Sequence, residues 1–401
     1  MGVVTPGEPA DLSRRQRTTS MAVALASTTL SVLPVFMLGA LAVFVRRDLS
    51  FSLTELGASA SAFYGTSALA SIHGGRSAQR LGPESALAIG AACSAAALLG
   101  VAGLANGWRS LSVFLVIGGC ANALSQPAAN ALVARDQLLD RQGISFGTLQ
   151  TAIPLSTLLA GLAVPSLGAN LGWRWAFVMA SAGAIPIVIY GLRHHRASAG
   201  HREDFGHPGA ILRKAPLYVL AVAGGFAAAP ANALGAFYVE SAVSNGISVE
   251  IAGLWLMAGS VCGICGRLMW GWGADRGRGD PLRSMSFLLL VGVGGFVLLG
   301  KGERAWYLLL GTVIAFGAGW AWKGLYNLAI VQHYPGWASA ALGVTQAGVF
   351  AGSVCGPLGF GVLLERTSYL VAWTSCAVCL GIAPGLVWLA RRMLRPHSAS
   401  G

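Results

Sequence analysis

One lysine, Lys323, lies in the middle of an otherwise apolar, aromatic and small-residue stretch, GAGWAWKGLYNLAIV. Trp320 precedes it by three residues and Asn327 follows it by four, so in a helix the three side chains share one face. Tyr326 follows Lys323 by three residues. An ammonium group in this setting can bind an anionic group, most simply a carboxylate, while the aromatic rings offer apolar surface.

Amide side chains form a second polar stripe. Asn122, Gln126 and Asn130 recur at intervals of four residues in an earlier apolar stretch, which also places them on one face of a helix. Gln150 and Gln346 add amides from two further apolar stretches. Amides donate and accept hydrogen bonds, so these five side chains could surround the polar part of a small solute. Taken singly, Asn122 and Asn130 could equally bond neighbouring helices to each other.

Acidic side chains lie near the ends of the apolar stretches and not in their interiors. Proton coupling in membrane proteins usually relies on a carboxylate or a histidine buried on the pathway, and the sequence offers none. Three alternatives stay open: uncoupled transport, exchange of one anion for another, and titration of Asp48, Glu55 or Glu240 at the outer rim.

The elements that must position these side chains are membrane-spanning helices. Of the 401 residues, 55% are hydrophobic and 10% are charged, and the mean hydropathy is +0.64, whereas about 25% of residues are charged in a soluble domain. We count twelve apolar runs of about the 20 residues that cross a bilayer as a helix. A β-barrel would need short alternating segments instead. The sequence therefore predicts an all-α polytopic membrane protein with 12 transmembrane helices.

The basic residues follow the loops. Although the net charge is +12, the arginines gather between alternate helices and form no nucleic-acid surface. The positive-inside rule then places both termini in the cytoplasm, with Arg267 counted on the cytoplasmic side. The first apolar run has no obvious cleavage site, so we interpret it as a retained helix and not as a signal peptide. We expect a multi-pass protein of the plasma membrane, which in a bacterium is the inner membrane.

The chain repeats itself at an offset of 196 residues. The matches include Leu38-Gly39-Ala40 with Leu234-Gly235-Ala236, Pro34 with Pro230, Gly147 with Gly343, and Gln150 with Gln346. At an offset of 197, Gln126 pairs with Lys323. The repeat predicts two six-helix pseudo-repeats. The predicted organisation is a cytoplasmic N-terminal tail (1–20), a six-helix bundle (21–192), a cytoplasmic linker (193–213), a second six-helix bundle (214–391) and a cytoplasmic C-terminal tail (392–401).

One loop carries a family motif. The stretch GWGADRGRGDP is similar to the G-x-x-x-D-R-x-G-R signature of the major facilitator superfamily (MFS) at Gly271, Asp275, Arg276 and Arg278. Parallel repeats of six helices are also typical of that superfamily, and the resemblance extends over essentially the whole chain. It implies the MFS fold, in which the first and fourth helices of each half line a central cavity. Lys323 and the stripe of three amides would then face this cavity.

The loop motifs predict a gate. Gly271 allows close helix approach, and Asp275 can face the positive N-terminal end of a neighbouring helix and hold the cytoplasmic side shut. The matching loop of the first half, GRSAQRLGP, contains Gly75 and Arg80, but Gln79 stands where the superfamily has an aspartate. One of the two gate contacts is therefore expected to be weaker. The alternative is that these charges only end helices and fix topology.

We therefore predict a secondary transporter that moves a small organic solute, preferably an organic anion, by rocking its two halves about a central site. If Lys323 instead snorkels to the interface or bonds two helices, efflux of lipophilic drugs or of a natural product, with or without proton coupling, takes precedence. A polytopic enzyme or a non-transporting sensor would need a catalytic set or a signalling domain, and the sequence indicates neither. We expect a monomer in the lipid bilayer, with a small-molecule substrate and no nucleic acid, metal, cofactor or catalytic residue.

Overall fold

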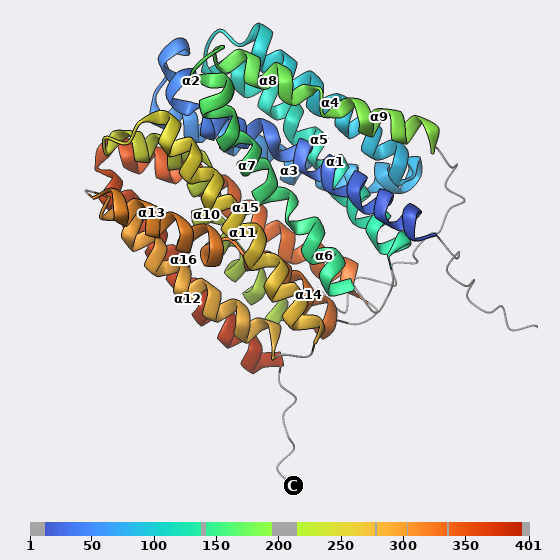
Figure 1. The fold of residues 1–401 in the computed structure, drawn as a ribbon. Helices are drawn as coiled ribbons and strands as arrows, with labels where there is room; N and C mark the ends of the chain where they lie inside the picture. Colours follow the sequence, from blue (N-terminus) through green and yellow to red (C-terminus); the bar gives the residue numbers. More distant parts are fainter. Residues whose placement is uncertain are drawn as a thin grey trace, which may run out of the picture.

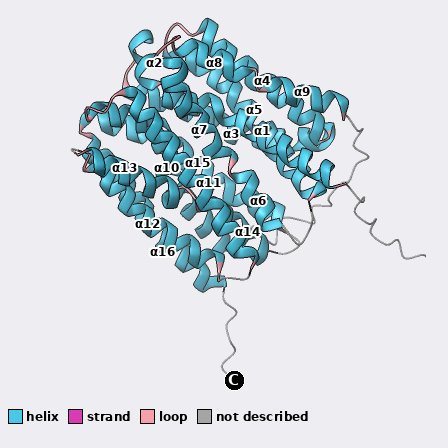
Figure 2. Ribbon diagram, viewed as in Figure 1, coloured by secondary structure: helices cyan, strands magenta, loops and turns pink. Residues whose placement is uncertain are grey.

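The computed structural model describes residues 13–137, 142–194, 215–276, 279–302, 304–334 and 337–394. Within these ranges the regular elements are helices, and there is no strand (Figure 2). Eleven helical segments are long and apolar enough to cross a membrane. The predicted all-α polytopic fold is thus confirmed. The count of twelve spans stays a prediction, because α3 is not among the eleven.

Two groups of helices follow each other along the chain (Figure 1). The first, blue to green, consists of α1 (Arg14–Ala40), α2 (Ala42–Leu49), α3 (Leu53–Leu81), α4 (Pro83–Leu104), α5 (Trp108–Asp136), α6 (Gln142–Gln150), α7 (Ala152–Ala163), the π-helix η2 (Val164–Gly168), α8 (Trp173–Ser181) and α9 (Ala184–Arg193). The second, yellow-green to red, consists of α10 (Ala215–Ser244), α11 (Val249–Asp275), α12 (Pro281–Gly300), α13 (Ala305–Ile314), the π-helix η4 (Ala315–Gly319), α14 (Lys323–His333), α15 (Ala338–Arg366) and α16 (Tyr369–Leu394). The predicted domain boundaries stay predictions, and nearly all of the linker lies outside the described residues.

Local chemistry explains where several helices begin and break. Ser52 and Glu55 form a capping box at the start of α3, in which each side chain accepts a hydrogen bond from the other residue's backbone N–H. Asp280 caps α12, whose first residue is a proline. Pro154 has no N–H to donate to the carbonyl of Gln150, four residues earlier, and the helix is interrupted there between α6 and α7.

The two halves come into backbone contact at the duplicated Leu-Gly-Ala motif. A Cβ atom added to Gly39 of α1 would lie 2.2 Å from the carbonyl oxygen of Gly235 on α10. On the flanks, α3 packs against α15 and α7 packs against α11. The second of these contacts includes a hydrogen bond of 2.7 Å between Thr157 and Ser260. Small residues allow this close approach between helices.

We call the end of the bundle at which α1 begins and α16 ends the terminal end, and the opposite end the far end. At the terminal end, a charged cluster joins α1, α4 and α5. Ser20 donates to Asp136 at 2.5 Å, and Arg135 donates to Asp136 at 2.6 Å and to Glu84 at 2.7 Å. Both carboxylates are buried, so the arginine supplies the charge that their burial requires.

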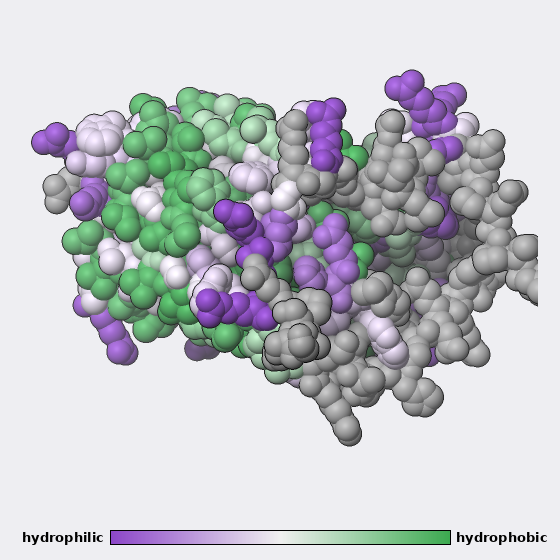
Figure 3. All heavy atoms as spheres, turned by 90° about the horizontal axis from the view of Figure 1, so that it is seen from below, coloured by the Kyte–Doolittle hydropathy of each residue, from purple (hydrophilic) through white to green (hydrophobic). Residues whose placement is uncertain are grey.

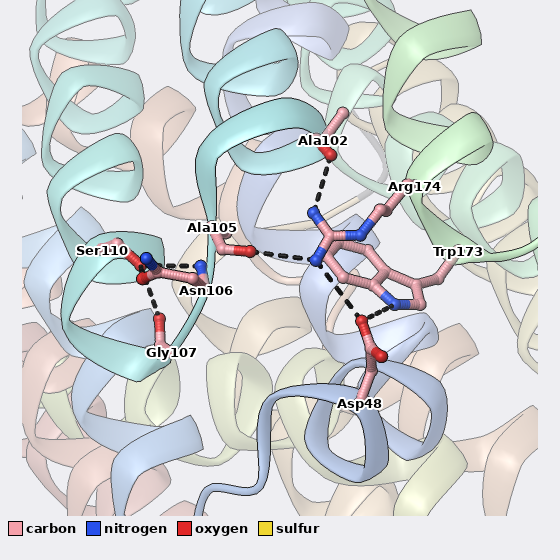
Figure 4. A network of polar contacts seen from close by, with 8 residues as sticks. All are labelled: Asp48, Ala102, Ala105, Asn106, Gly107, Ser110, Trp173 and Arg174. Atoms are coloured by element: carbon pink, nitrogen blue, oxygen red, sulfur yellow. Dashed lines mark hydrogen bonds and ion pairs between the residues drawn. The ribbon is translucent and has the colours of Figure 1, made fainter.

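At the far end, Arg174 at the start of α8 holds the end of α4 (Figure 4). Its guanidinium group donates to the carbonyl oxygens of Ala102 and Ala105 at 2.8 and 3.0 Å. Asp48, at the end of α2, lies 3.4 Å from the same group and accepts a hydrogen bond of 3.1 Å from Trp173. A cation close to the last carbonyls of α4 also stabilises the helix dipole.

The outer surface between the two ends is apolar. Figure 3, seen from below relative to Figure 1, shows a broad hydrophobic face with hydrophilic residues gathered toward both of its ends. Large exposed hydrophobic residues of α12 and α16 include Phe287, Leu290 and Val378. A surface of this kind is expected to face lipid hydrocarbon.

Candidate substrate-binding site

Lys323 begins α14 and directly follows a distorted part of its membrane span. That span passes from α13 through the π-helix η4 and three turn residues before the α-helix resumes, and such distortions are frequent at functional sites. The Lys323 Nζ donates a hydrogen bond of 2.8 Å to Oε1 of Gln346 on α15. It also lies 5.2 Å from the ring centroid of Tyr326 and 5.7 Å from that of Trp322, within cation–π range.

The position of Lys323 bears on whether it snorkels. About three helical turns, roughly 15 Å, separate it from the end of α14 at His333. Its amino group is bonded to Gln346 on the neighbouring helix. That bond is compatible with binding a solute and with bonding two helices to each other, and the choice between these roles and snorkelling stays a prediction.

The aromatic residues near Lys323 contact the other half of the protein and the neighbouring helices. Trp320 is buried and packs edge-on against Phe36 of α1, with 5.5 Å between ring centroids, and against Phe316, with 5.1 Å. Tyr326 is fully buried, and its hydroxyl donates to the carbonyl oxygen of Leu220 on α10 at 2.8 Å. The Tyr326 hydroxyl is therefore engaged in helix packing, while Trp320 lies where the two halves meet.

The amide stripe on α5 divides into two parts. Asn122 is 2% exposed, accepts a hydrogen bond from Ser31 of α1 and donates one to Ser67 of α3, both at 3.1 Å. Of its two predicted roles, the geometry favours the bonding of helices. Gln126 and Asn130 are half-buried and have no hydrogen bond to another residue in the described ranges. Their amides remain available to a solute.

Asn327 and Gln150 resemble Gln126 in this respect. Asn327 lies one helical turn after Lys323, and Gln150 is the last residue of α6. Within the described part of the chain, neither has a hydrogen-bond partner. By the repeat, Gln126 and Gln150 correspond to Lys323 and Gln346, but only the second pair is bonded.

The two predicted gate loops have different surroundings. On α11, Gly271 lies close to α6, because a Cβ added to Gly147 would be 3.8 Å from its Cα. The corresponding pair in the other repeat is Gly75 on α3 and Gly343 on α15, and a Cβ on either would meet no described atom within 4 Å. Leu69, on the same part of α3, is 83% exposed. At the terminal end, α6 and α11 are thus in contact, whereas the space next to Gly75 and Gly343 is open among the described residues.

The charged gate residues are only partly described. The Arg276 guanidinium lies 3.7 Å from the ring centroid of Trp272, and Arg80 is exposed near the end of α3. The side chain of Asp275 and the whole of Arg278 lie outside the described residues. Their gating roles stay predictions.

Arg267 has a different place from the one predicted. It was predicted among the cytoplasmic loop charges, but it lies within the candidate span Val249–Gly273 and is 3% exposed, so it is not a loop residue. Its Nη2 donates a hydrogen bond of 2.7 Å to the carbonyl oxygen of Trp320, and its Cζ lies 5.9 Å from the ring centroid of the same residue. The apolar stretch LMWGWGA after Arg267 was the signal that the helix continues past it.

The three acids predicted at the outer rim are already engaged. Asp48 accepts hydrogen bonds from Trp173 and Arg174, and Glu55 belongs to the capping box of α3. Glu240 of α10 is 8% exposed and forms an ion pair with Arg46 of α2, which joins the two halves at the far end.

Two groups of membrane-spanning helices that pack against each other, with a cation and unbonded amides within the spans, are the architecture of a membrane transport protein. The family model of the Major Facilitator Superfamily matches residues 24–357. The chain belongs to this superfamily. In the ranges that the structure describes, no cluster of three or more histidine, cysteine, aspartate or glutamate side chains could hold a metal ion.

Relatives and solved structures agree with this family. The chain is 24% identical over 307 residues, 74% of its length, to an uncharacterised MFS-type transporter of Mycobacterium tuberculosis, of which it covers 68%. It is 32% identical over 162 residues to an MFS-type efflux pump of Mycolicibacterium smegmatis, a match that covers 38% of each chain. A bacterial homologue of the human lysosomal transporter Spinster, in an inward-facing and occupied conformation, has a TM-score of 0.74 at 16% identity, over 95% of this chain and 98% of that one. The nucleoside transporter NupG has a TM-score of 0.71 at 15% identity, over 93% and 100%.

Proposed function

We propose that the protein is a secondary transporter that carries a small organic anion across the plasma membrane, with Lys323 binding the anionic group. One observation carries this proposal. Lys323 is half-buried within a membrane span, and the hydrogen-bond partner of its ammonium group in the described structure, Gln346, is a neutral amide. A cation is costly inside a membrane without a counter-ion. An anionic solute would supply the missing negative charge.

The unbonded amides would complete the site. Gln126 and Asn130 on α5, Asn327 on α14 and Gln150 on α6 are partly or largely buried and have no partner among the described residues. A polar group that loses water without gaining a hydrogen bond is destabilised. Hydrogen bonds to the solute would remove that cost and would orient the solute against Lys323.

The contacts between the halves support alternating access by a rocker switch. At the far end the halves are joined by the Gly39–Gly235 contact and by the Arg46–Glu240 ion pair. At the terminal end, the space beside Gly75 is open among the described residues. We propose that this conformation is open toward the cytoplasm, the side on which the arginine distribution places both termini, and that the protein works as a monomer.

Thermal stability of the detergent-purified protein tests the role of Lys323. Ligands that bind the folded state raise its Tm, so a panel of organic anions, neutral metabolites and lipophilic cations is compared on the wild type, Lys323→Gln and Lys301→Gln. Lys301 is exposed at the far end and provides the matched control for loss of a lysine charge. We expect anions to stabilise the wild type and Lys301→Gln but not Lys323→Gln. Equal stabilisation of all three proteins by anions would refute the assignment.

Efflux of lipophilic compounds is the second candidate. The M. smegmatis relative bears the name of an efflux pump, and the contact of Trp320 with Phe36 and Phe316 offers aromatic surface between the halves. Stabilisation by lipophilic cations that is unchanged in Lys323→Gln would favour this function. The lysine would then be a structural bond between α14 and α15.

A further inference from the structure

Arg267 is a buried cation whose hydrogen-bonding capacity is largely unused. It is 3% exposed within the span of α11. Its Nη2 bonds the carbonyl oxygen of Trp320, but Nε and Nη1 are buried and have no hydrogen-bond partner in the described structure. A guanidinium group stays charged in proteins, so it cannot reduce this cost by losing a proton. A buried charge with donors to spare is a candidate ligand-binding group.

Arg267 and Lys323 flank the same distorted segment. The helix α11 packs tightly on η4, since a Cβ added to Gly266 would lie 2.6 Å from the carbonyl oxygen of Gly317. Arg267 bonds Trp320, three residues before Lys323. Arg267 precedes the end of α11 at Asp275 by about 12 Å, and Lys323 precedes the end of α14 by roughly 15 Å. The two cations therefore lie at similar depth.

Neither cation has a carboxylate counter-ion in the described structure. The elements around them carry acids only toward their ends: Glu240 on α10, Glu250 and Asp275 on α11, and Glu365 on α15. The segments α1, α6, α7, α13, η4 and α14 contain no acidic residue. The described residues of the site thus present two positive charges and supply no negative charge of their own.

We propose that Arg267 is a second anion-binding residue of the transport site, and that the substrate is a dianion whose two negative charges are shared between Arg267 and Lys323. This inference rests on the proposed anion transport and narrows its substrate class. A dicarboxylate and an organic phosphate have this chemistry in common. Two cations left unpaired in the ligand-free protein become paired only when such a solute binds.

The test compares solutes of graded negative charge. Succinate, monomethyl succinate and dimethyl succinate carry two, one and no negative charges at neutral pH, and glycerol 3-phosphate is paired with glycerol. Each is titrated against the Tm of the purified full-length wild type, Arg267→Gln, Arg267→Lys, Lys323→Gln and, as control, Arg109→Gln, which removes an exposed charge at the start of α5. Comparing the succinate series with glycerol 3-phosphate shows whether the substrate is a dicarboxylate or an organic phosphate.

In the wild type and the control, we expect succinate to bind at least about tenfold more tightly than monomethyl succinate, because the dianion gains one charge-assisted hydrogen-bonded contact. Arg267→Gln should lose that advantage and keep the response to the monoanion, whereas Lys323→Gln should lose both. Arg267→Lys keeps the positive charge but lacks the planar fork of the guanidinium group. Its preference for the dianion should lie between those of the wild type and Arg267→Gln.

The Tm without ligand is an independent readout. Removing an unsatisfied buried charge relieves its desolvation cost, so Arg267→Gln should raise the Tm of the ligand-free protein. A purely structural arginine would give a lower Tm and an unchanged preference for dianions, which would overturn the inference. If the monoanion stabilises the wild type through Lys323 and the dianion adds nothing, the inference fails and anion transport stands. If no anion stabilises the wild type more than its neutral counterpart does, both the dianion inference and the proposed anion transport fail.

Discussion

Replacing Gly39 by alanine should push the two halves apart at the far end. The new Cβ would lie 2.2 Å from the carbonyl oxygen of Gly235 and 2.9 Å from the Cα of Ala236. Both are backbone atoms of α10, so no side chain can rotate to make room. The contact is short by about 1 Å relative to a normal separation of heavy atoms. We therefore expect α1 and α10 to separate at this crossing.

The size of the effect follows from the nature of the clash. Overpacking by one methyl group against rigid surroundings costs about 1–3 kcal/mol. Only the conformation with the far end closed bears this cost, so the ratio of closed to open molecules should fall by a factor of roughly 5 to 150. The reciprocal replacement, Gly235→Ala, places its Cβ 2.6 Å from Cε1 of Phe36. A side chain can move, so this variant should show a smaller shift.

Distances between spin labels measure the expected opening. Arg47 on α2 and Ser248 before α11 are exposed on opposite halves, and cysteines at these positions, in a background without reactive native cysteines, carry the labels. Gly39→Ala should populate a longer distance than the wild type does. Gly294→Ala is the control, because a Cβ there would meet no described atom within 4 Å. An unchanged distance in Gly39→Ala, or a larger change in Gly235→Ala, would refute the reasoning.

Three further predictions concern other parts of the protein. Gly75→Leu should leave the Tm nearly unchanged, because the space beside Gly75 is open in this conformation. If α3 must approach α15 in the transport cycle, the same variant should abolish uptake in proteoliposomes, and uptake at the wild-type rate would contradict this. Asn122→Ala should lower the Tm by breaking two buried hydrogen bonds, at a cost of about 1–2 kcal/mol, whereas Gln126→Ala should reduce uptake with little change in Tm; the reverse pattern would show that the roles are exchanged. Burial raises the pKa of the Asp280 carboxyl, but the hydrogen bond and charge of Arg391, together with hydrogen bonds from the backbone of Leu282 and Arg283, outweigh this effect, so the pKa lies below its usual value. The lowered pKa of Asp280 stabilises the folded protein above the unfolded pKa of about 3.9, and this stabilisation is lost as the pH falls through the lower folded value. Arg391→Gln should therefore lower the Tm at neutral pH and leave it unchanged at the acid end of a series of melts at different pH.

The fold could be predicted from the sequence because the bilayer leaves few choices. Long apolar runs in a membrane must satisfy their backbone groups internally, which makes them helices. The repeat also indicated which segments correspond, and the two copies of Leu-Gly-Ala meet at Gly39 and Gly235. Glycine conserved between the two halves was informative here because a side chain at Gly39 would separate the helices.

The polar site was less predictable, because hydrogen-bond partners come from other helices. Asn122 and Gln126 are four residues apart and share one face of α5. Only Asn122 lies between Ser31 and Ser67, and it is bonded to both. No sequence pattern in α5 contains that information. Arg267 was misplaced for a related reason, since a charge near a predicted helix end is usually at the interface, and only the packing of α11 on η4 shows that it is buried.

Divergence between the two repeats has consequences for the transport cycle. In the first half, the pair Gln126 and Gln150 is neutral. In the second half, the corresponding pair Lys323 and Gln346 carries one positive charge, and Arg267 adds another. If the rim acids remain engaged in their far-end contacts, the described interior offers no carboxylate that could neutralise these cations when the site is empty. An empty carrier would then change conformation with two uncompensated charges, at a cost that a bound dianion removes. For the proposed anion carrier, we therefore predict exchange of one anion for another and not transport in a single direction.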